Sequence, residues 1–336
     1  MEIVELGKLS KEELQRLLGC IKKDPRMVVP PLPGYDSGVH FLGDKCMVVS
    51  TDPCTGVPEE WFGWLLINYS ASDVALFGAK PEYCTINLLG PPRTKSEFFE
   101  KVMNQVCEAA NELDMVVVTG HTGIYESVKK MVGVCTAYGT VEKEKLIMPC
   151  NVESGDLILQ VKEVGLELLT NFSYLKNDLA IKLFGRSQAN QLMGLIKIQS
   201  CVKEAIHLAE MEGVSAMHDA TEGGFVSALN ELADASDLGF QLEREKILIR
   251  PETRILQNHF GLSENEIFSM SSAGSILVAI DVKEKEKVRK KLGNLGIVSS
   301  FVGEFTKSKE RIIFENNKKA TFPQVAVDPY NKILSG

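Results

Sequence analysis

The stretch that organises the chain is Met217-His218-Asp219-Ala220-Thr221-Glu222-Gly223-Gly224. Residues 212–216 before it are typical of a turn and a short strand. Residues 225–235 after it carry apolar side chains at helical spacing. A strand therefore runs into a loop with two carboxylates, and a pair of glycines opens a helix. This order predicts free backbone N–H groups and the positive end of a helix dipole above the strand, where phosphate groups bind.

The acidic residues of this loop qualify that prediction. Asp219 and Glu222 would repel a bare phosphate, so a divalent cation between carboxylates and phosphate is the natural partner. Thr221, Gly223 and Gly224 are candidate nucleotide-binding residues, because paired glycines let a backbone approach a phosphate closely. An ordinary strand-to-helix turn, with Asp219 or Thr221 as the helix cap, explains the same residues. The stretch alone leaves both interpretations open.

Composition limits the classes of function. The chain has 336 residues, 44% hydrophobic and 24% charged, which is typical of a globular protein of roughly two domains. Its formal net charge of -8 argues against nonspecific nucleic-acid binding and leaves small molecules or proteins as partners. We expect no membrane span and no signal peptide. The eight scattered cysteines lack a C-x-x-C pair, so we expect reduced thiols and a cytoplasmic location.

Strand and helix patterns alternate through both halves, which predicts an α/β (α+β) architecture. The pattern breaks near residues 150–155, so we expect an N-terminal domain over residues 1–150 and a C-terminal domain over residues 151–336. The periodicity also predicts a buried helix over residues 60–77, an amphipathic helix over residues 95–113 and one long helix over residues 190–211.

Carboxylates recur at the ends of elements in the first half. Asp36 lies in a loop between two glycines, Asp52 follows Thr51 at the end of a strand, and Asp73 lies near the end of the buried helix. With Asp219 they make four carboxylates beside small residues. Grouped carboxylates and glycine-rich turns suit one or more Mg²⁺ ions that hold a polyphosphate. Each aspartate alone is better explained as a cap or turn residue, and the recurrence favours the metal site.

Other candidates for chemistry are weaker. His121, in Gly120-His121-Thr122 after a buried strand, would contact phosphate or transfer a proton, or else be a hydrogen-bonded loop residue. Together with Asp52 and Asp219 it is a candidate catalytic residue. His218 is expected only to orient Asp219. Cys54 is a candidate nucleophile, although a structural thiol is the favoured interpretation. The P-loop, dinucleotide-binding, zinc-protease and nucleophile-elbow motifs are absent.

Six short motifs follow one another along the chain. They are Gly34-Tyr35-Asp36-Ser37, Ser50-Thr51-Asp52, Ala71-Ser72-Asp73-Val74-Ala75 with Gly78-Ala79-Lys80-Pro81, Gly120-His121-Thr122, Asp219-Ala220-Thr221-Glu222-Gly223-Gly224 and Gly303-Glu304. Their order and spacing resemble the aminoimidazole ribonucleotide synthase (PurM-like) superfamily over essentially the whole chain. Within it, the chain is most similar to the hydrogenase expression/formation (HypE-like) proteins and their archaeal AIR synthase-related relatives.

The resemblance implies a PurM-like two-domain fold, in which N-terminal strands pair across a homodimer into a β-barrel and a C-terminal α/β domain folds over it. It implies Mg²⁺ and ATP phosphates at Asp36, Asp52 and Asp73, with residues 120–122 nearby and residues 219–224 completing the site. The implied chemistry is transfer of the γ-phosphoryl group to an oxygen, often of an amide or carboxamide, of a small-molecule substrate. A hydrogenase-maturation protein is the implied partner.

The chain departs from the family pattern at several motif positions. The usual Asn-Asp pair is Ser72-Asp73 here, a double acidic motif is Gly34-Tyr35-Asp36, and Gly-Gly-Asp-Thr is replaced by Thr119-Gly120-His121-Thr122. HypE-like proteins carry a carbamoyl group on a terminal cysteine, and this chain has no cysteine after Cys201. We therefore expect a different acceptor. A nucleotide-sensing or assembly protein without turnover stays open, as does a thiamine-phosphate or purine-pathway activity.

Overall fold

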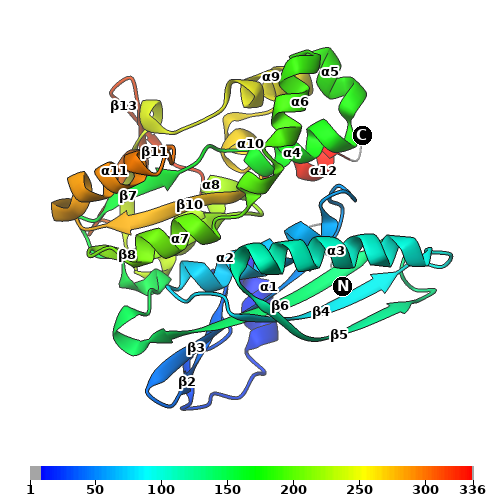
Figure 1. Ribbon diagram of the computed structural model, residues 1–336. Helices are drawn as coiled ribbons and strands as arrows, with labels where there is room; N and C mark the ends of the chain where they lie inside the picture. Colours follow the sequence, from blue (N-terminus) through cyan, green and yellow to red (C-terminus); the bar gives the residue numbers. More distant parts are fainter. Residues whose placement is uncertain (1–8, 335–336) are drawn as a thin grey trace.

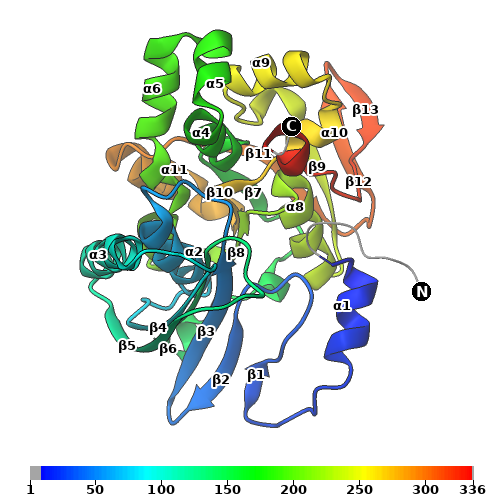
Figure 2. The same ribbon diagram turned by 90° about the vertical axis from the view of Figure 1, so that its right-hand side faces the viewer.

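The structure is a computed structural model that describes residues 9–334. It contains two sheets, one of six strands in the order β1-β2-β3-β6-β4-β5 and one of seven in the order β13-β12-β9-β11-β7-β10-β8. Figure 1 shows the first sheet at the bottom, with α2 and α3 between it and the rest of the chain, and Figure 2 shows the same layers from the side. The expected mixed α/β architecture is confirmed.

The first sheet and its helices occupy the N-terminal half of the chain. Buried and less buried residues alternate along these strands, as expected for a sheet with one face on a core. In β3, Cys46, Val48, Ser50 and Cys54 all face inward. The expected helices over residues 60–77 and 95–113 are present as α2 and α3. The elements are α1 (Lys11–Leu18), β1 (Met27–Val29), β2 (Gly38–Leu42), β3 (Lys45–Cys54), α2 (Phe62–Leu76), β4 (Tyr83–Gly90), α3 (Ser96–Leu113), β5 (Val116–Ile124) and β6 (Val132–Glu142).

The second sheet carries helices on its upper side in Figure 1. Its strands are β7 (Leu157–Val161), β8 (Val214–Ala220), β9 (Gly239–Glu243), β10 (Ser272–Ile280), β11 (Ser299–Thr306), β12 (Arg311–Glu315) and β13 (Lys318–Thr321). Its helices are α4 (Leu166–Leu175), α5 (Asn177–Phe184), α6 (Arg186–Gly194), α7 (Val202–Ala209), α8 (Gly224–Ala235), α9 (Pro251–Phe260), α10 (Glu264–Phe268), α11 (Lys285–Asn294) and α12 (Tyr330–Leu334).

The single long helix expected over residues 190–211 is wrong. Helix α6 ends at Gly194, a 3-10 turn covers Ile196–Gln199, and α7 begins at Val202. The Lys162 ammonium group explains how the break is stabilised, because it donates hydrogen bonds to the carbonyls of Ile198 and Ser200 at 3.1 and 2.7 Å. A local tertiary contact therefore overrides the helical periodicity.

Helix α2 joins the two halves of the molecule. Fourteen of its fifteen residues are buried, so it is enclosed on all sides. It packs on β3 and β6 of the first sheet and on α7 and β8 of the second half. One apolar core accordingly includes residues of both halves, such as Leu65 of α2 and Met217 of β8. This packing brings the polar end of α2 next to the strand that carries Asp219.

The opposite face of the first sheet, here called the open face, has no helix over it among residues 9–334 in either view. Strand pairing places Val49, Tyr138, Tyr83 and Val116 in one row across this face. Val116 and Val118 of β5 are 55% and 53% exposed. Closure of this sheet into a barrel by a second copy stays a prediction. Within the described part of the chain, no helix is long and apolar enough to cross a membrane.

Candidate nucleotide and metal site

Four aspartates from four separate elements meet between the two halves of the molecule. Asp36 lies in the loop before β2, Asp52 in β3, Asp73 in α2 and Asp219 in β8. Asp73 is buried and accepts a hydrogen bond from Ser50 Oγ at 2.7 Å. Burial, and then the charges of Asp52, Asp219 and Asp36, raise the pKa of Asp73 well above its usual value. The grouping predicted from the sequence is therefore present.

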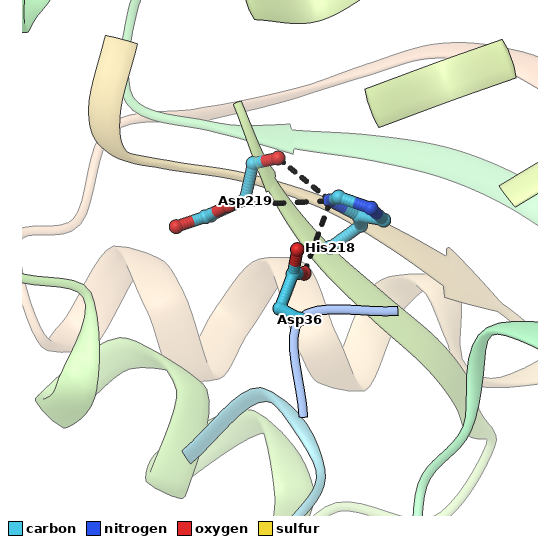
Figure 3. A group of neighbouring side chains, drawn as sticks. All are labelled: Asp36, His218 and Asp219. Carbon is cyan, nitrogen blue, oxygen red and sulfur yellow. Dashed lines mark hydrogen bonds and ion pairs between the residues drawn. The ribbon is translucent and has the colours of Figure 1, made fainter. Parts of the chain in front are cut away.

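His218 lies at the centre of a contact between the two halves. Its Nδ1 atom is 3.4 Å from Asp36 Oδ2, and its Nε2 atom is 2.9 Å from Glu231 Oε2 of α8. Figure 3 shows Asp36 and Asp219 on the same side of the imidazole ring. His218 is only 3% exposed. Its contacts thus extend beyond Asp219, which it was expected to orient, because it also contacts the loop that carries Asp36.

The surroundings of His218 favour its charged form. Nδ1 lies 2.8 Å from the carbonyl oxygen of Asp219, so this nitrogen carries a proton and donates. Burial alone would lower the pKa of His218, but the charge of Asp36, the adjacent Glu231 carboxylate and Asp219 outweigh burial and raise it to about 10. A protonated Nδ1 cannot ligate a metal ion. In the protein without a bound ligand, these neighbours favour a protonated His218 ring.

The donor set fits Mg²⁺. Donor atoms of Asp36, His218 and Asp219 all lie within 4.8 Å of one another, and with the ring nitrogen protonated the carboxylate oxygens remain as ligands. Mg²⁺ prefers oxygen ligands and keeps several waters. Burial raises the pKa of Asp73 most, and the charges of Asp52, Asp219 and Asp36 raise it further; a divalent cation would relieve this repulsion between carboxylates.

The glycine-rich loop differs from the prediction in one respect. Gly223 N–H donates to Asp328 Oδ2 at 3.1 Å, and Gly224 N–H donates to the Thr221 carbonyl at 2.8 Å. The expectation that these N–H groups are free is therefore wrong, because Asp328 from a distant segment accepts from Gly223 and Thr221 of the same loop accepts from Gly224. Thr221 Oγ1 donates to Asp219 Oδ1 at 3.4 Å. Nucleotide binding by Thr221, Gly223 and Gly224 stays a prediction.

Residues 120–122 lie apart from the carboxylates within one chain. Strand pairing aligns Asp52, Cys135, Ile86 and Gly120 across β3, β6, β4 and β5. Three strand spacings separate the ends of this row, roughly 14 Å. Because side chains alternate along a strand, His121 faces the open side of the sheet, as Thr51 does. The expected position of Gly120, His121 and Thr122 beside the carboxylates is thus not seen in a single chain.

The open-face residues have partners of their own. His121 Nε2 lies 2.6 Å from the Tyr125 hydroxyl, and Thr136 Oγ1 donates to Thr51 Oγ1 at 3.0 Å.

Cys54 is buried, and burial, followed by the charges of Glu167 and Asp52, raises the pKa of its thiol. A thiol that resists ionisation is a poor nucleophile, which favours the structural interpretation of Cys54.

Sequence reasoning missed two acidic residues near Asp219. Glu167, in the first turn of α4, accepts a hydrogen bond from Ala273 N–H at 3.2 Å. Burial raises the pKa of Glu167 to about 8, with further contributions from Asp328, Glu222 and Asp219. Asp328 accepts from Ser271 Oγ at 2.5 Å as well as from Gly223. Both residues occur in segments without a recognisable motif, so only the tertiary structure reveals them.

Two parts of the chain match family models. Residues 34–141 match the model for the AIR synthase related protein, N-terminal domain, and residues 153–315 match the model for its C-terminal domain. These ranges include all four aspartates of the site.

Similar proteins include a hydrogenase expression/formation protein and a carbamoyl dehydratase. The chain is 28% identical over 295 residues to a Methanocaldococcus jannaschii protein named as a hydrogenase expression/formation protein, a match that covers 83% of this chain and 82% of that protein. It is 27% identical over 244 residues to the carbamoyl dehydratase HypE of Cupriavidus necator, covering 70% of this chain and 66% of that protein.

Solved structures share the fold at low identity. A hydrogenase maturation protein HypE in complex with ATP has a TM-score of 0.71 at 18% identity and covers 94% of this chain and 93% of its own. A HypE–HypF complex gives 0.68 at 18%, with 85% and 92% covered. Thiamine monophosphate kinase from Aquifex aeolicus gives 0.68 at 18%, with 92% and 96% covered. At these identities the likeness shows the fold.

Proposed function

The chain belongs to the AIR synthase related protein family, and from this membership we propose that it binds Mg-ATP at Asp36, Asp52, Asp73 and Asp219 and transfers the γ-phosphoryl group to a carboxamide-type oxygen. The mutual repulsion of these carboxylates around buried Asp73 supports the proposal most strongly, because a divalent cation bound among them would relieve it. When bound, Mg²⁺ would neutralise the triphosphate and its developing charge. The protein would act in the cytoplasm, where ATP is available.

The protein's own residues would position the reactants. Asp36 comes from the first domain and Asp219 from the second, so a ligand held by both would lie at the boundary between the halves. His218 would hold these two carboxylates in place as an internal cation. A fixed arrangement of charges lowers the barrier because it need not reorganise during the reaction.

The names of the similar proteins support the acceptor class and a partner. One relative is a carbamoyl dehydratase, one structural neighbour is in complex with ATP, and another is a HypE–HypF complex. A carbamoyl group is an amide, and its oxygen becomes a leaving group once it is phosphorylated. We extend this chemistry to the present chain, with an acceptor carried on another molecule, and we propose a maturation protein as its partner.

Two other functions have specific support. Tyr35, Ser72 and His121 stand where the family has acidic or amide side chains, which favours a nucleotide-binding assembly protein without turnover. The shared fold with thiamine monophosphate kinase favours a kinase of a small phosphorylated substrate. ADP release with a carbamoyl compound, with thiamine monophosphate or with formylglycinamidine ribonucleotide would separate these alternatives.

The proposal includes a homodimer formed through the open face. Val116 and Tyr83, neighbours in the row across this face, are 55% and 41% exposed. Exposed apolar patches on sheets are typical of protein interfaces. His121 and Thr51 lie on the same face, so in the dimer they would meet the partner subunit.

Thermal unfolding with and without Mg-ATP tests the nucleotide site. Ligand at about 100 times its dissociation constant should add roughly 2.7 kcal/mol to the wild-type protein. Asp219→Asn should lose this gain, because Asp219 is 4% exposed at the centre of the cluster. A wild-type protein that shows no Mg-dependent gain would contradict the nucleotide site. Binding without ADP release, with any of the three acceptors, would favour the assembly protein.

A further inference from the structure

The Asp36 loop depends on the second domain for its position. Asp36 lies between β1 and β2, outside any strand or helix. Gly34, two residues before it, has a φ of +80°. The contact of Asp36 Oδ2 with His218 Nδ1 at 3.4 Å joins this loop to β8 of the other half. A cation ligand carried on a loop needs such support, because loops without it move more than strands and helices.

Glu231 supports both ends of this contact. Its carboxylate lies 2.9 Å from His218 Nε2, on the side of the ring opposite Nδ1. Its aliphatic part lies under the loop, because a Cβ at Gly34 would be 3.1 Å from Glu231 Cβ and 3.2 Å from Cγ. One side chain of α8 thus contacts the turn before Asp36 and also the ring that holds Asp36. The absence of a side chain at Gly34 allows this approach.

We propose that Glu231 is a positioning residue of the cation site, which fixes the His218 ring and the Gly34 turn so that Asp36 faces Asp219 before any ligand binds. This inference rests on the proposed function, in which Asp36 and Asp219 are Mg²⁺ ligands. Glu231 itself is not a ligand in this assignment. It acts through the imidazole ring, which is not a ligand itself but contacts the proposed ligand Asp36, in the way that residues around a metal site orient its ligands.

The arrangement of charges explains why support is needed. Carboxylate oxygens of Asp36 and Asp219 lie within 4.8 Å of each other, so they repel one another before a cation binds. An unsupported loop would move Asp36 away from Asp219, and cation binding would then have to reverse that movement. The cost of ordering would appear as a weaker affinity for Mg-ATP.

Three variants of α8 test this assignment. Glu231→Ala removes both the stem and the carboxylate, and it should weaken Mg-ATP binding 10- to 100-fold in calorimetry, the usual range for loss of an outer-shell partner. Glu231→Gln keeps the stem and a polar group beside Nε2, so it should recover most of the affinity. Asp234→Ala is the matched control, because Asp234 lies one turn further along α8 and pairs with Lys11 and Arg311 instead.

Amide hydrogen exchange of residues 34–38 in the ligand-free protein gives a second readout. Exchange should rise in Glu231→Ala and stay at the wild-type rate in Glu231→Gln and Asp234→Ala. The assignment is overturned if Glu231→Ala binds Mg-ATP as the wild type does, or if the glutamine variant is as impaired as the alanine variant. If the wild type does not bind Mg-ATP, the proposed function fails, and loop exchange still decides whether Glu231 positions the loop.

Discussion

Replacing Asp73 with asparagine should stabilise the ligand-free protein and at the same time remove its response to Mg-ATP. Asp73 is 6% exposed, and burial together with Asp52, Asp219 and Asp36 raises its pKa well above 3.8. Asparagine has the shape of a protonated aspartate. Its oxygen can accept from Ser50 Oγ, and its amide can donate toward Asp52, so the variant keeps the neutral hydrogen bonds without the charge.

The size of the gain in stability follows from the difference in proton binding by Asp73 between the folded and the unfolded protein. Because the folded-state pKa of Asp73 is raised, its contribution to stability is complete below pH 3.8 and is lost as the pH rises. Asparagine does not titrate, so the advantage of the variant grows above that pH. At pH 7, about three pH units higher, the ceiling is roughly 4 kcal/mol at about 1.4 kcal/mol per unit. Relaxation and water reduce this, and we expect about 2 kcal/mol and, for a chain of 336 residues, a melting temperature about 3 °C higher.

Thermal unfolding between pH 5 and pH 7, monitored by circular dichroism in the presence of a metal chelator, measures this gain in stability. Mg-ATP at about 100 times its dissociation constant should then add roughly 2.7 kcal/mol to the wild type and nothing to the variant. Asp114→Asn is the control, because the Asp114 side chain is 88% exposed and forms an ion pair with Lys80. A folded variant that melts below the wild type at pH 7, or that keeps the Mg-ATP gain, would refute the reasoning.

Three further outcomes can be measured. Gly224→Ala should lower the free energy of unfolding in urea by about 2 kcal/mol or more, because φ is +55° and a Cβ would lie 2.4 Å from the Met270 carbonyl oxygen. The control Gly293→Ala, with open space around the added Cβ, should be neutral or stabilising. The stability advantage of Glu167→Gln over the wild type should grow from pH 4.5 to about pH 8 and stay constant above pH 8. The raised pKa of Glu167 makes the wild type lose stability over that interval, whereas glutamine does not titrate. Equal pH profiles of the two proteins in urea unfolding would contradict this. Val116→Lys should give a folded monomer in light scattering, and a wild-type monomer at micromolar concentration would remove the dimer from the proposal.

The sequence was sufficient to predict the fold class and the grouping of the four aspartates. Hydrophobic periodicity located α2, and the ends of elements marked Asp52, Asp73 and Asp219 as residues that could meet. The motif order then indicated a family whose models cover both halves of the chain. These features are local or depend on the order of motifs along the chain, so a single sequence contains them.

Contacts between distant segments were not predictable in the same way. Glu231 occupies one polar position on an amphipathic helix, and no local pattern shows that it faces His218. Asp328 reaches Gly223 from a segment without regular structure, 105 residues along the chain. His121 was expected near the carboxylates, but the strand order β3-β6-β4-β5 places it at an edge and on the opposite face. Strand order and facing direction are tertiary properties, which periodicity alone does not specify.

The charges of the site bear on whether the protein binds a cation and a nucleotide, and not on whether it catalyses a reaction. Burial raises the pKa of Asp73, Glu167 and Asp328, so folding without a cation has an energetic cost in this region. Neutral residues at these positions would make the fold more stable, so the carboxylates are better explained by a ligand that offsets their cost. Both an enzyme and a nucleotide-binding assembly protein would bind that ligand. The cluster thus supports Mg-ATP binding, and only turnover with a defined acceptor distinguishes catalysis from assembly.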